Sequence, residues 1–404
     1  MTDQRDRGGA PPALPPALLE RALGAAGEGI VIADARLPDM PLIYVNAAFE
    51  EVTGYPGVEA LGRNCRFLQG SGSDPAALAA IRSALAERRG VVVELLNYRK
   101  DGVPFWNRLS ITPVLDEAGE LTHFIGVQSD VTERRLAQER LEAANRQMRR
   151  DLEAAARIQM SLLPAAPPRL PGARVAWTFR PCTELAGDML NVFAMDPDTV
   201  GFFVLDVSGH GVGAALLSFT LAHTLVATPG QSCLFRPAGQ GWLPAPPAEV
   251  AAELNRRFPL DPAAPQFFTL FYGLLAPSSG RVRYVSAGHP LAVVAPAGGV
   301  PRRLAATGPP VGVSEAAHYT EGALELRAGD RLVVCTDGLS EALSPAGEEL
   351  GFDRVVQVVA GAVGRGVEEL VEVLAEEGVR WAGGAPHDDI SVLALEGLCA
   401  AGED

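Results

Sequence analysis

Two groups of residues in this chain have the types and the spacing that chemistry requires. The first surrounds Cys65. Asn64 and Arg66 are its direct neighbours, and Gln69 follows four positions after the cysteine. An arginine guanidinium binds phosphate through two parallel hydrogen bonds, and side-chain amides form hydrogen bonds to the polar atoms of a heterocyclic ring. This spacing could therefore hold a thiol over a bound ring system with a phosphate tail, although a lone buried cysteine is by default a small core residue.

The second group is a set of aspartates that end or precede strand-like runs in the C-terminal half: Asp188, Asp206, Asp337, Asp388 and Asp389. Glycine follows closely after some of them, which lets the backbone approach the carboxylates. Gathering several carboxylates at one rim is costly unless cations neutralise them, and oxygen-only ligands favour Mg²⁺ or Mn²⁺. The set predicts a divalent metal centre, whereas a polar cap at a strand end would explain only one aspartate at a time.

The composition is that of a folded protein with two or three domains. Of the 404 residues, 48% are hydrophobic and 21% are charged. The net charge of -15 argues against a nucleic-acid partner and against binding to an anionic membrane, because both usually require a basic face. The five cysteines are far apart and form no CxxC pair, so neither a disulfide framework nor a zinc site is predicted. With no spanning apolar run and no signal-peptide core, we expect a cytoplasmic protein.

The N-terminal part of the chain predicts a small α+β domain. Residues 1–16 are polar and then rich in Pro and Gly, which predicts a disordered lead. Within residues 17–131, short helices are expected between a first pair of strands and a final set of three, joined by hairpin turns. The expected strands are Gly29–Asp34, Pro41–Asn46, Val91–Tyr98, Val103–Leu115 and Leu121–Val131.

Residues 132–165 predict a helical linker with a heptad pattern. One core position holds Leu141, Met148, Ala155 and Leu162, and its companion holds Gln138, Asn145, Leu152 and Gln159. We expect a parallel homodimer through a weak coiled coil over residues 136–163, since polar core residues lower its stability. The alternative is a single amphipathic helix that packs on its own domain.

Residues 166–398 predict a second α/β domain, followed by a tail at 399–404. The expected strands are Val200–Val207, Phe267–Ala276, Arg281–Ala287, Asp330–Thr336 and Ile390–Leu395, and the expected helices are Val212–Leu225, Pro247–Arg257 and Gly366–Ala382. The segment from Pro229 to Pro247 contains many Pro and Gly residues and is interpreted as a surface loop.

The segment Gly62–Gln69 resembles the motif of LOV photosensors, the flavin-binding branch of the PAS family. The expected element order, two strands, helices and three antiparallel strands, is also that of PAS domains. The resemblance implies FMN as cofactor and Cys65 as the thiol that forms the photoadduct. It further implies that Gln128 senses the flavin N5 proton and passes the signal through the last strand into the linker helix. The cofactor-binding residues that it implies are Asn64, Cys65, Arg66, Gln69, Arg82, Asn97, Asn107 and Gln128.

Residues 155–396 resemble the metal-dependent PPM-type serine/threonine phosphatases, specifically the bacterial RsbU/SpoIIE branch. The resemblance rests on segments such as Thr336–Ala342 and His387–Ser391, and it implies a β-sandwich flanked by helices that binds two divalent cations, Mn or Mg. The metal ligands that it implies are Asp188, Asp206, the Val207 carbonyl, Asp337, Asp388 and Asp389. The catalytic residues are then Asp188, Asp206, Asp337 and Asp388, with His210 and His289 as candidates for proton transfer or phosphate contact. Ala186 and Asn191 depart from the family pattern, which more often has Gly and Asp there.

The sequence therefore predicts a multidomain protein: an α+β PAS/LOV sensor, a coiled-coil linker and an α/β PPM phosphatase domain. The predicted function is a blue-light-regulated protein phosphatase that acts on a phosphorylated anti-sigma-factor antagonist of STAS fold. One alternative is a light-gated docking protein whose phosphatase domain is degenerate, which Asn191 favours. An anti-sigma kinase and a flavin sensor of redox state are further alternatives, although the sequence has no Walker-type phosphate loop.

Overall fold

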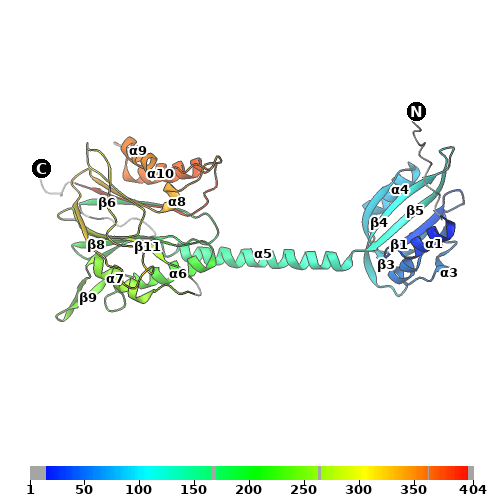
Figure 1. The fold of residues 1–404 in the computed structure, drawn as a ribbon, viewed down its shortest axis with the longest axis horizontal. Coiled ribbons are helices and arrows are strands. Elements are labelled where there is room, and N and C mark those ends of the chain that lie inside the picture. Colours follow the sequence, from blue (N-terminus) through cyan, green and yellow to red (C-terminus); the bar gives the residue numbers. More distant parts are fainter. Residues whose placement is uncertain (1–14, 165–169, 171, 263–264, 363, 399–404) are drawn as a thin grey trace, which may run out of the picture. The chain divides into compact units, whose positions relative to one another are not determined.

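The computed structural model describes residues 15–164, 170, 172–262, 265–362 and 364–398 of the chain. The chain divides into two compact units, residues 1–147 and 148–404, which are described separately below. The predicted tail at 399–404 and nearly all of the predicted disordered lead fall outside the described residues. The first helix, α1 (Pro16–Gly24), begins where that lead was expected to end (Figure 1).

The N-terminal unit is built on one five-stranded antiparallel sheet. Its strands are β1 (Gly29–Asp34), β2 (Leu42–Val45), β3 (Val91–Tyr98), β4 (Pro104–Leu115) and β5 (Leu121–Asp130). They lie in the order β2-β1-β5-β4-β3, so the first and last strands of the unit meet at its centre. Along the chain, two strands, then helices, then three strands follow one another, as the sequence predicts.

The segment between β2 and β3 forms the helices of this unit. They are α2 (Ala47–Thr53), α3 (Gly57–Ala60), the short 3₁₀ helix η1 (Cys65–Leu68) and α4 (Pro75–Ala86). Side-chain caps fix where they begin: Asn46 accepts from the Phe49 amide at 3.0 Å and Asp74 from the Ala76 amide at 3.0 Å. Phe49, Leu42 and Leu68 form the centre of a small apolar core beneath them.

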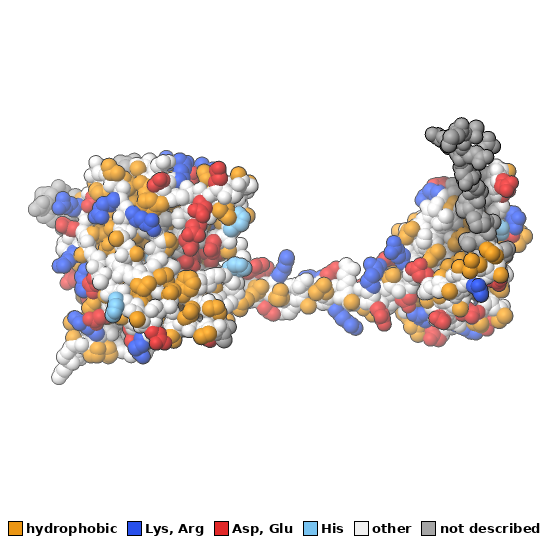
Figure 2. Space-filling model, in the orientation of Figure 1, with side chains coloured by type: hydrophobic (Ala, Val, Ile, Leu, Met, Phe, Trp, Pro, Cys, Tyr) orange, Lys and Arg blue, Asp and Glu red, His pale blue; other side chains and the backbone are white. Residues whose placement is uncertain are grey.

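Helix α5 (Thr132–Met160) follows β5 almost directly. Neither Gly nor Pro occurs within it, so nothing in the sequence interrupts the helix before Pro164. The Asp130 carboxylate accepts from the Thr132 amide at 2.9 Å and so caps its first turn. Leu141 and Met148, at predicted core positions of the coiled coil, are 62% and 58% exposed. Figure 2 shows hydrophobic side chains along the helix.

The part of α5 that is free to form a coiled coil ends before residue 163, where the predicted coiled coil was expected to end. Gln159, expected at a coiled-coil core position, is buried within the C-terminal unit, and Leu163 belongs to that unit's core. The alternative of a helix packed on its own domain thus describes the last turn of α5, while the middle of the helix keeps an exposed apolar face.

The C-terminal unit is a sandwich of two five-stranded antiparallel sheets. One sheet has the order β15-β12-β11-β8-β7 and the other has the order β14-β13-β16-β17-β6. The strands of the first sheet are β7 (Met189–Asp196), β8 (Thr199–Val207), β11 (Phe268–Ala276), β12 (Arg281–Ala287) and β15 (Gly322–Glu325). Those of the second are β6 (Ala173–Arg180), β13 (Leu291–Ala295), β14 (Arg302–Arg303), β16 (Arg331–Cys335) and β17 (Ile390–Gly397).

Helices cover both outer faces of the sandwich, as Figure 1 shows. The helices are α6 (Val212–Thr224) and α7 (Pro247–Arg257) on one side, and α8 (Asp337–Ser340), α9 (Phe352–Gly361) and α10 (Val367–Trp381) on the other. The larger core fills the space between the sheets, and a second core joins α9 and α10 to the β16–β17 sheet. The predicted sandwich flanked by helices is confirmed.

One interpretation of the sequence was wrong. The Pro- and Gly-rich segment from Pro229 to Pro247 contains a hairpin, β9 (Phe235–Ala238) and β10 (Gly241–Pro244), and so is more than a surface loop. Proline is tolerated there because this two-stranded sheet is made of edge strands. No helix within the described residues is both long and apolar enough to cross a membrane.

Candidate cofactor cavity and candidate metal centre

The N-terminal unit encloses a cavity between its sheet and the helices η1 and α4. Counting the part that is open to solvent, its empty space is about 720 Å³. Its walls are largely apolar, with Val31, Leu95 and Phe124 among them. Seven of the eight predicted cofactor-binding residues line it, namely Asn64, Cys65, Arg66, Gln69, Asn97, Asn107 and Gln128.

A chain of side-chain hydrogen bonds runs along the floor of this cavity. Asn107 Nδ2 donates to Asn97 Oδ1 at 2.9 Å and to Gln128 Oε1 at 3.2 Å. Gln128 Nε2 in turn donates to Cys65 Sγ at 3.3 Å. Asn107 Oδ1 is buried and has no hydrogen-bond partner. A buried acceptor without a donor is unfavourable, so the cavity fits a ligand that brings an N–H group to this edge.

Cys65 is held as a neutral thiol. It opens η1 and lies beside the apolar core, where desolvation raises the pKa of the thiol to about 11. The hydrogen bond from Gln128 offsets only part of this effect. A protonated thiol that faces a cavity is unreactive toward ordinary electrophiles at neutral pH, so its chemistry requires an activated partner.

The two arginines predicted to bind the phosphate, Arg66 and Arg82, differ in their position relative to the cavity. Arg66 is at the cavity, where its guanidinium is paired with the exposed Asp39 carboxylate at 2.6 Å. Asn64 Nδ2 donates to the Asp39 carbonyl at 2.6 Å, which fixes the same corner. Arg82 is exposed on α4 and is not among the residues that line the cavity, so its predicted role stays a prediction.

The start of α5 is bonded to the sheet of this unit. Thr132 Oγ1 accepts from the Trp106 amide at 2.8 Å, and the Val131 amide donates to the Trp106 carbonyl at 2.8 Å. The Arg135 guanidinium lies 3.8 Å from the centre of the Trp106 ring. Since Gln128 is on β5 and Trp106 is on the paired strand β4, the cavity floor and the helix start share one pair of strands.

In the C-terminal unit, the predicted aspartates come together from four separate segments. Asp206 is near the end of β8, Asp337 opens α8, Asp188 precedes β7, and Asp388 and Asp389 precede β17. Figure 2 shows acidic side chains gathered on one face of this unit. Asp188 and Asp389 are buried, whereas Asp388 is exposed.

Neighbouring polar groups hold the two buried carboxylates. Asp188 Oδ2 accepts from Thr336 Oγ1 at 2.8 Å and from Ser391 Oγ at 2.7 Å, so its other oxygen can take a further partner. Asp389 Oδ1 accepts from the Cys182 amide and Oδ2 from the Gly187 amide, both at 2.8 Å. Asp389 therefore fixes the loop before Asp188, whichever role it has toward a metal.

The cluster is electrostatically strained. Burial raises the pKa of Asp206 to about 7, and the charges of Asp337 and Asp388 add to the effect. Burial also raises the pKa of Asp337 to about 6 and the pKa of Asp388 above its ordinary value. The pKa of Asp188 is well above its ordinary range, because of burial and then of the Asp206 charge. Such a set of oxygen donors fits hard divalent cations, which would relieve the repulsion.

Two glycines allow these segments to approach so closely. A Cβ on Gly338 would lie 2.1 Å from the carbonyl oxygen of Asp389, and one on Gly187 would lie 3.1 Å from the carbonyl oxygen of Val207. Both contacts involve backbone atoms, which cannot move aside as a flexible side chain can. The glycines next to Asp188 and Asp337 in the sequence are thus explained by close backbone approach.

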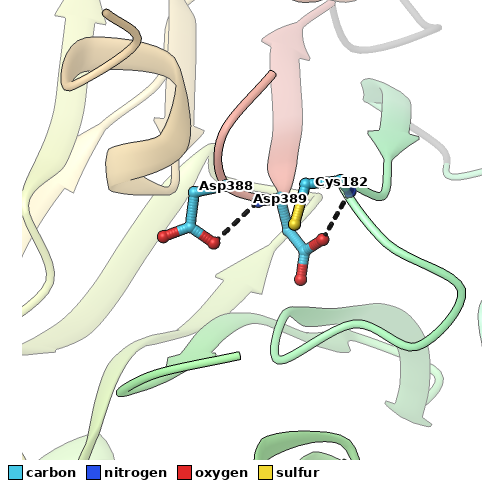
Figure 3. A group of neighbouring side chains, drawn as sticks. All are labelled: Cys182, Asp388 and Asp389. Carbon is cyan, nitrogen blue, oxygen red and sulfur yellow. Dashed lines mark hydrogen bonds between the residues drawn. The ribbon is translucent and has the colours of Figure 1, made fainter. Parts of the chain in front are cut away.

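Sequence reasoning missed Cys182 as a neighbour of this cluster. Its Sγ and carboxylate oxygens of Asp388 and Asp389 all lie within 4.8 Å of one another (Figure 3). Burial, with the Asp389 carboxylate as the next cause, raises the pKa of the Cys182 thiol to about 12. No motif in the sequence marks Cys182, because the contact joins residues about two hundred positions apart.

The two candidate histidines differ in their surroundings. His210 is exposed in the loop after β8, close enough to Asp388 for its charge to lower the pKa of that carboxyl. His289 is buried against Phe271 and paired with Thr269 Oγ1 at 3.0 Å, and desolvation lowers its pKa to about 3. His289 is therefore a neutral core residue in the folded protein, whereas His210 is placed to meet a ligand.

Comparison with protein families identifies both units. Residues 196–397, half of the chain, match the family of stage II sporulation protein E (SpoIIE). The chain belongs to the SpoIIE family. Residues 27–133 match the PAS domain family. The chain is thus a fusion of a LOV-type PAS domain with a PPM-type SpoIIE domain.

Curated relatives of the LOV domain include blue-light-activated histidine kinases and a phototropin. The chain is 50% identical over 119 residues to a blue-light-activated histidine kinase of Rhizobium johnstonii, covering 30% of this chain and 34% of the kinase. It is 48% identical over 114 residues to phototropin-1A of Oryza sativa subsp. japonica, covering 28% of this chain and 12% of the phototropin. The chain therefore spans about a third or less of the length of these curated relatives.

A solved structure of a LOV domain is also similar. It is that of the Erythrobacter litoralis EL346 blue-light activated histidine kinase, with 43% identity over 26% of this chain and 96% of that chain, at a TM-score of 0.25.

Proposed function

We propose that this protein is a blue-light-regulated, metal-dependent protein serine/threonine phosphatase. The observation that carries the proposal is one continuous series of contacts in the LOV domain, from Cys65 through Gln128 on β5 to the start of α5. The same helix ends against the loop that carries Asp188, in the SpoIIE domain. Within the LOV domain the start of α5 is thus bonded to a strand of the sensor sheet, and within the SpoIIE domain its last turn is bonded to the loop that carries Asp188.

FMN is the ligand that we propose for the cavity. When bound, a flavin supplies absorption of blue light and an electrophilic ring carbon. Cys65 would supply the thiol, and Asn97, Asn107 and Gln128 would bond the polar edge of the ring, with Asn107 Oδ1 gaining the donor that it lacks. Arg66 would hold the phosphate after leaving Asp39, because both side chains are exposed and such a pair contributes little.

The signal would leave the cavity through Gln128. A side-chain amide offers a donor at one end and an acceptor at the other, and rotation exchanges them. A change in the protonation of the ligand edge would favour the rotated amide and break the bond from Gln128 to Cys65 or that from Asn107. Either change alters β5 next to the residues that hold the start of α5.

The carboxylates of the SpoIIE domain would hold two divalent cations, Mn²⁺ or Mg²⁺. Bound cations supply a water of lowered pKa and neutralise a phosphoryl group. Asp188, Asp206, Asp337 and Asp388 are the protein ligands in this proposal, with the Val207 carbonyl beside them. His210 would contact the phosphoryl group or move a proton near it, since it is exposed close to Asp388. The family supports a phosphorylated STAS-type anti-sigma-factor antagonist as substrate.

The test is turnover of p-nitrophenyl phosphate with Mn²⁺, in the dark and under blue light, by the wild type and by Cys65→Ala. We expect a light-dependent rate in the wild type and none of that dependence in Cys65→Ala. Asp188→Asn is the control for the metal centre and should lose turnover under both conditions. No turnover by the wild type, with an intact flavin spectrum, would favour a docking protein over an enzyme.

A further inference from the structure

The last turn of α5 contains a buried side chain that the proposed mechanism has not used. Gln159 is 6% exposed, although it belongs to a helix whose other residues are mostly exposed. Its amide pairs with both polar groups of one residue: Nε2 donates to the Ala186 carbonyl at 2.7 Å, and Oε1 accepts from the Ala186 N–H at 3.0 Å. The side chain thus binds the Ala186 backbone as a neighbouring strand would.

A third partner fixes the orientation of this amide. Gln159 Nε2 also donates to Ser218 Oγ on α6 at 3.1 Å. Ser218 Oγ lies 3.2 Å from the Ala186 carbonyl and is fully buried. An amide turned by half a rotation would place its acceptor against the Ala186 carbonyl and its donor against the Ala186 N–H, so only one orientation satisfies the site.

The residue that Gln159 holds lies two positions before Asp188. Ala186 is 1% exposed, and the next two residues are fixed from the other side, where the Gly187 amide donates to Asp389 and Asp188 accepts from Thr336 and Ser391. The short segment from Ala186 to Asp188 is therefore held between the end of α5 and the β16–β17 sheet. Removing Gln159 would leave the buried Ala186 N–H without a partner and the Ala186 carbonyl with Ser218 Oγ alone, which is costly away from water.

We propose that Gln159 is a positioning residue for the metal centre: through the Ala186 backbone it sets the place of Asp188 relative to Asp206. A displacement of the last turn of α5 then moves a metal-binding carboxylate directly. This inference rests on the proposed function, since it assumes that Asp188 binds a divalent cation. It assigns the contact through which the linker helix acts on the phosphatase site.

The experiment compares Gln159→Leu, Gln159→Glu and the control Ile158→Ala in the full chain. Ile158 is 60% exposed on the same turn, so its truncation tests for general damage to the helix. Mn²⁺ affinity is measured by calorimetric titration of the metal-free protein, and kcat is measured at saturating Mn²⁺. Hydrogen exchange of the Ala186 amide is followed without metal, and circular dichroism checks the fold.

Both Gln159 variants should weaken Mn²⁺ binding by about 10-fold or more, as the loss of outer partners of metal ligands generally does. The kcat at saturating Mn²⁺ should change far less, and the Ala186 amide should exchange faster. Gln159→Glu keeps the acceptor for the Ala186 N–H, so it should lose affinity while protecting that amide better than Gln159→Leu does. Ile158→Ala should match the wild type.

Unchanged Mn²⁺ affinity in a folded Gln159→Glu protein would overturn the proposal, as would equal loss in Ile158→Ala. Should Gln159→Leu fail to fold, Gln159→Glu and the exchange of the Ala186 amide still decide the matter. Failure of the proposed function looks different: the wild type itself would bind no Mn²⁺, or would bind it equally well in Asp188→Asn.

Discussion

At the scale of single residues, Gln128 is the side chain on which light regulation depends in the function that we propose. Its amide contacts both Cys65 and Asn107, and its strand leads into α5. A leucine there would keep the volume of the side chain but neither hydrogen bond. We expect Gln128→Leu to retain the light-induced loss of flavin absorbance, since Cys65 is untouched, while the ratio of light to dark phosphatase rates falls several-fold toward one.

The matched control is Gln69→Leu, because Gln69 is an exposed amide at the rim of the same cavity. Because Gln69 is itself a predicted cofactor-binding residue, the ratio is compared at equal flavin content, where it should stay close to that of the wild type. A normal ratio in Gln128→Leu would show that the signal leaves the cavity by another side chain.

The raised pKa values of the aspartates predict how the stability of the metal-free protein depends on pH. The pKa of Asp206 is about 7 in the folded protein against an ordinary value of 3.8, so between these values the folded state binds more protons than the unfolded state. The contribution of Asp206 to the free energy of unfolding therefore falls as pH rises from about 4 to about 7, and the raised pKa values of Asp337 and Asp188 act in the same direction, against the opposite contribution of His289. We expect a lower melting temperature for the C-terminal unit at pH 8 than at pH 5 in the absence of metal.

Asp206→Asn should weaken this dependence, because the amide does not titrate. Added Mn²⁺ should raise the melting temperature most at the higher pH, where the carboxylates are charged. A metal-free wild type that is more stable at pH 8 than at pH 5 would contradict the assignment of a repulsive cluster.

At the scale of elements, the turn from β16 into α8 must touch the turn into β17. A Cβ on Gly338 would lie 2.1 Å from the Asp389 carbonyl oxygen, so Gly338→Ala must push Asp337 away from Asp388. We expect at least a 100-fold loss of Mn²⁺-dependent turnover, measured with p-nitrophenyl phosphate, while the photochemistry of the LOV domain is unchanged. Gly361→Ala is the control, since nothing lies within 4 Å of its added Cβ; full activity in Gly338→Ala would contradict the close approach.

The exposed apolar face of α5 needs a partner, and we propose that a second copy of the chain supplies it as a parallel coiled coil. Leu141 and Met148 lie one heptad apart and are both exposed. The double variant Leu141→Glu/Met148→Glu should convert a dimer into a monomer in light scattering at micromolar concentration. Ala143→Glu, which places the same charge on the outer heptad face, should remain a dimer; a wild type that is monomeric throughout would refute the proposal.

How far the sequence predicts these elements depends on the range of the interactions that fix them. Val91–Tyr98 and Arg281–Ala287 were predicted to the residue, because periodicity and turn residues are local signals. The hairpin at Phe235–Pro244 was missed, since its prolines are typical of loops and only the edge position permits them. Gln159 was assigned to a coiled coil because a heptad pattern does not reveal that a loop 27 residues later covers one of its members.

At the scale of the whole molecule, one uninterrupted helix is bonded to the LOV domain at its start and to the SpoIIE domain at its end. The rotation of its last turn about the helix axis, relative to its first turn, should therefore affect the light dependence of the phosphatase rate. Inserting one alanine after Ala143 turns the following residues by about 100°, whereas inserting seven leaves them about 20° from their original direction. We expect the one-residue insertion to abolish the light dependence of the phosphatase rate and the seven-residue insertion to retain most of it. Equal light-to-dark ratios in the two proteins would argue against transmission by the helix.

The contact between Arg135 and Trp106 gives this protein an internal reporter. Trp106 is the one tryptophan in the sequence before residue 148; the other three, Trp177, Trp242 and Trp381, follow it. A guanidinium 3.8 Å from the indole ring should alter its emission, so intensity at this position records whether the first turn of α5 stays docked. With the other three tryptophans replaced by phenylalanine, stopped-flow fluorescence after a flash would time the arrival of the signal at the helix, without any attached dye.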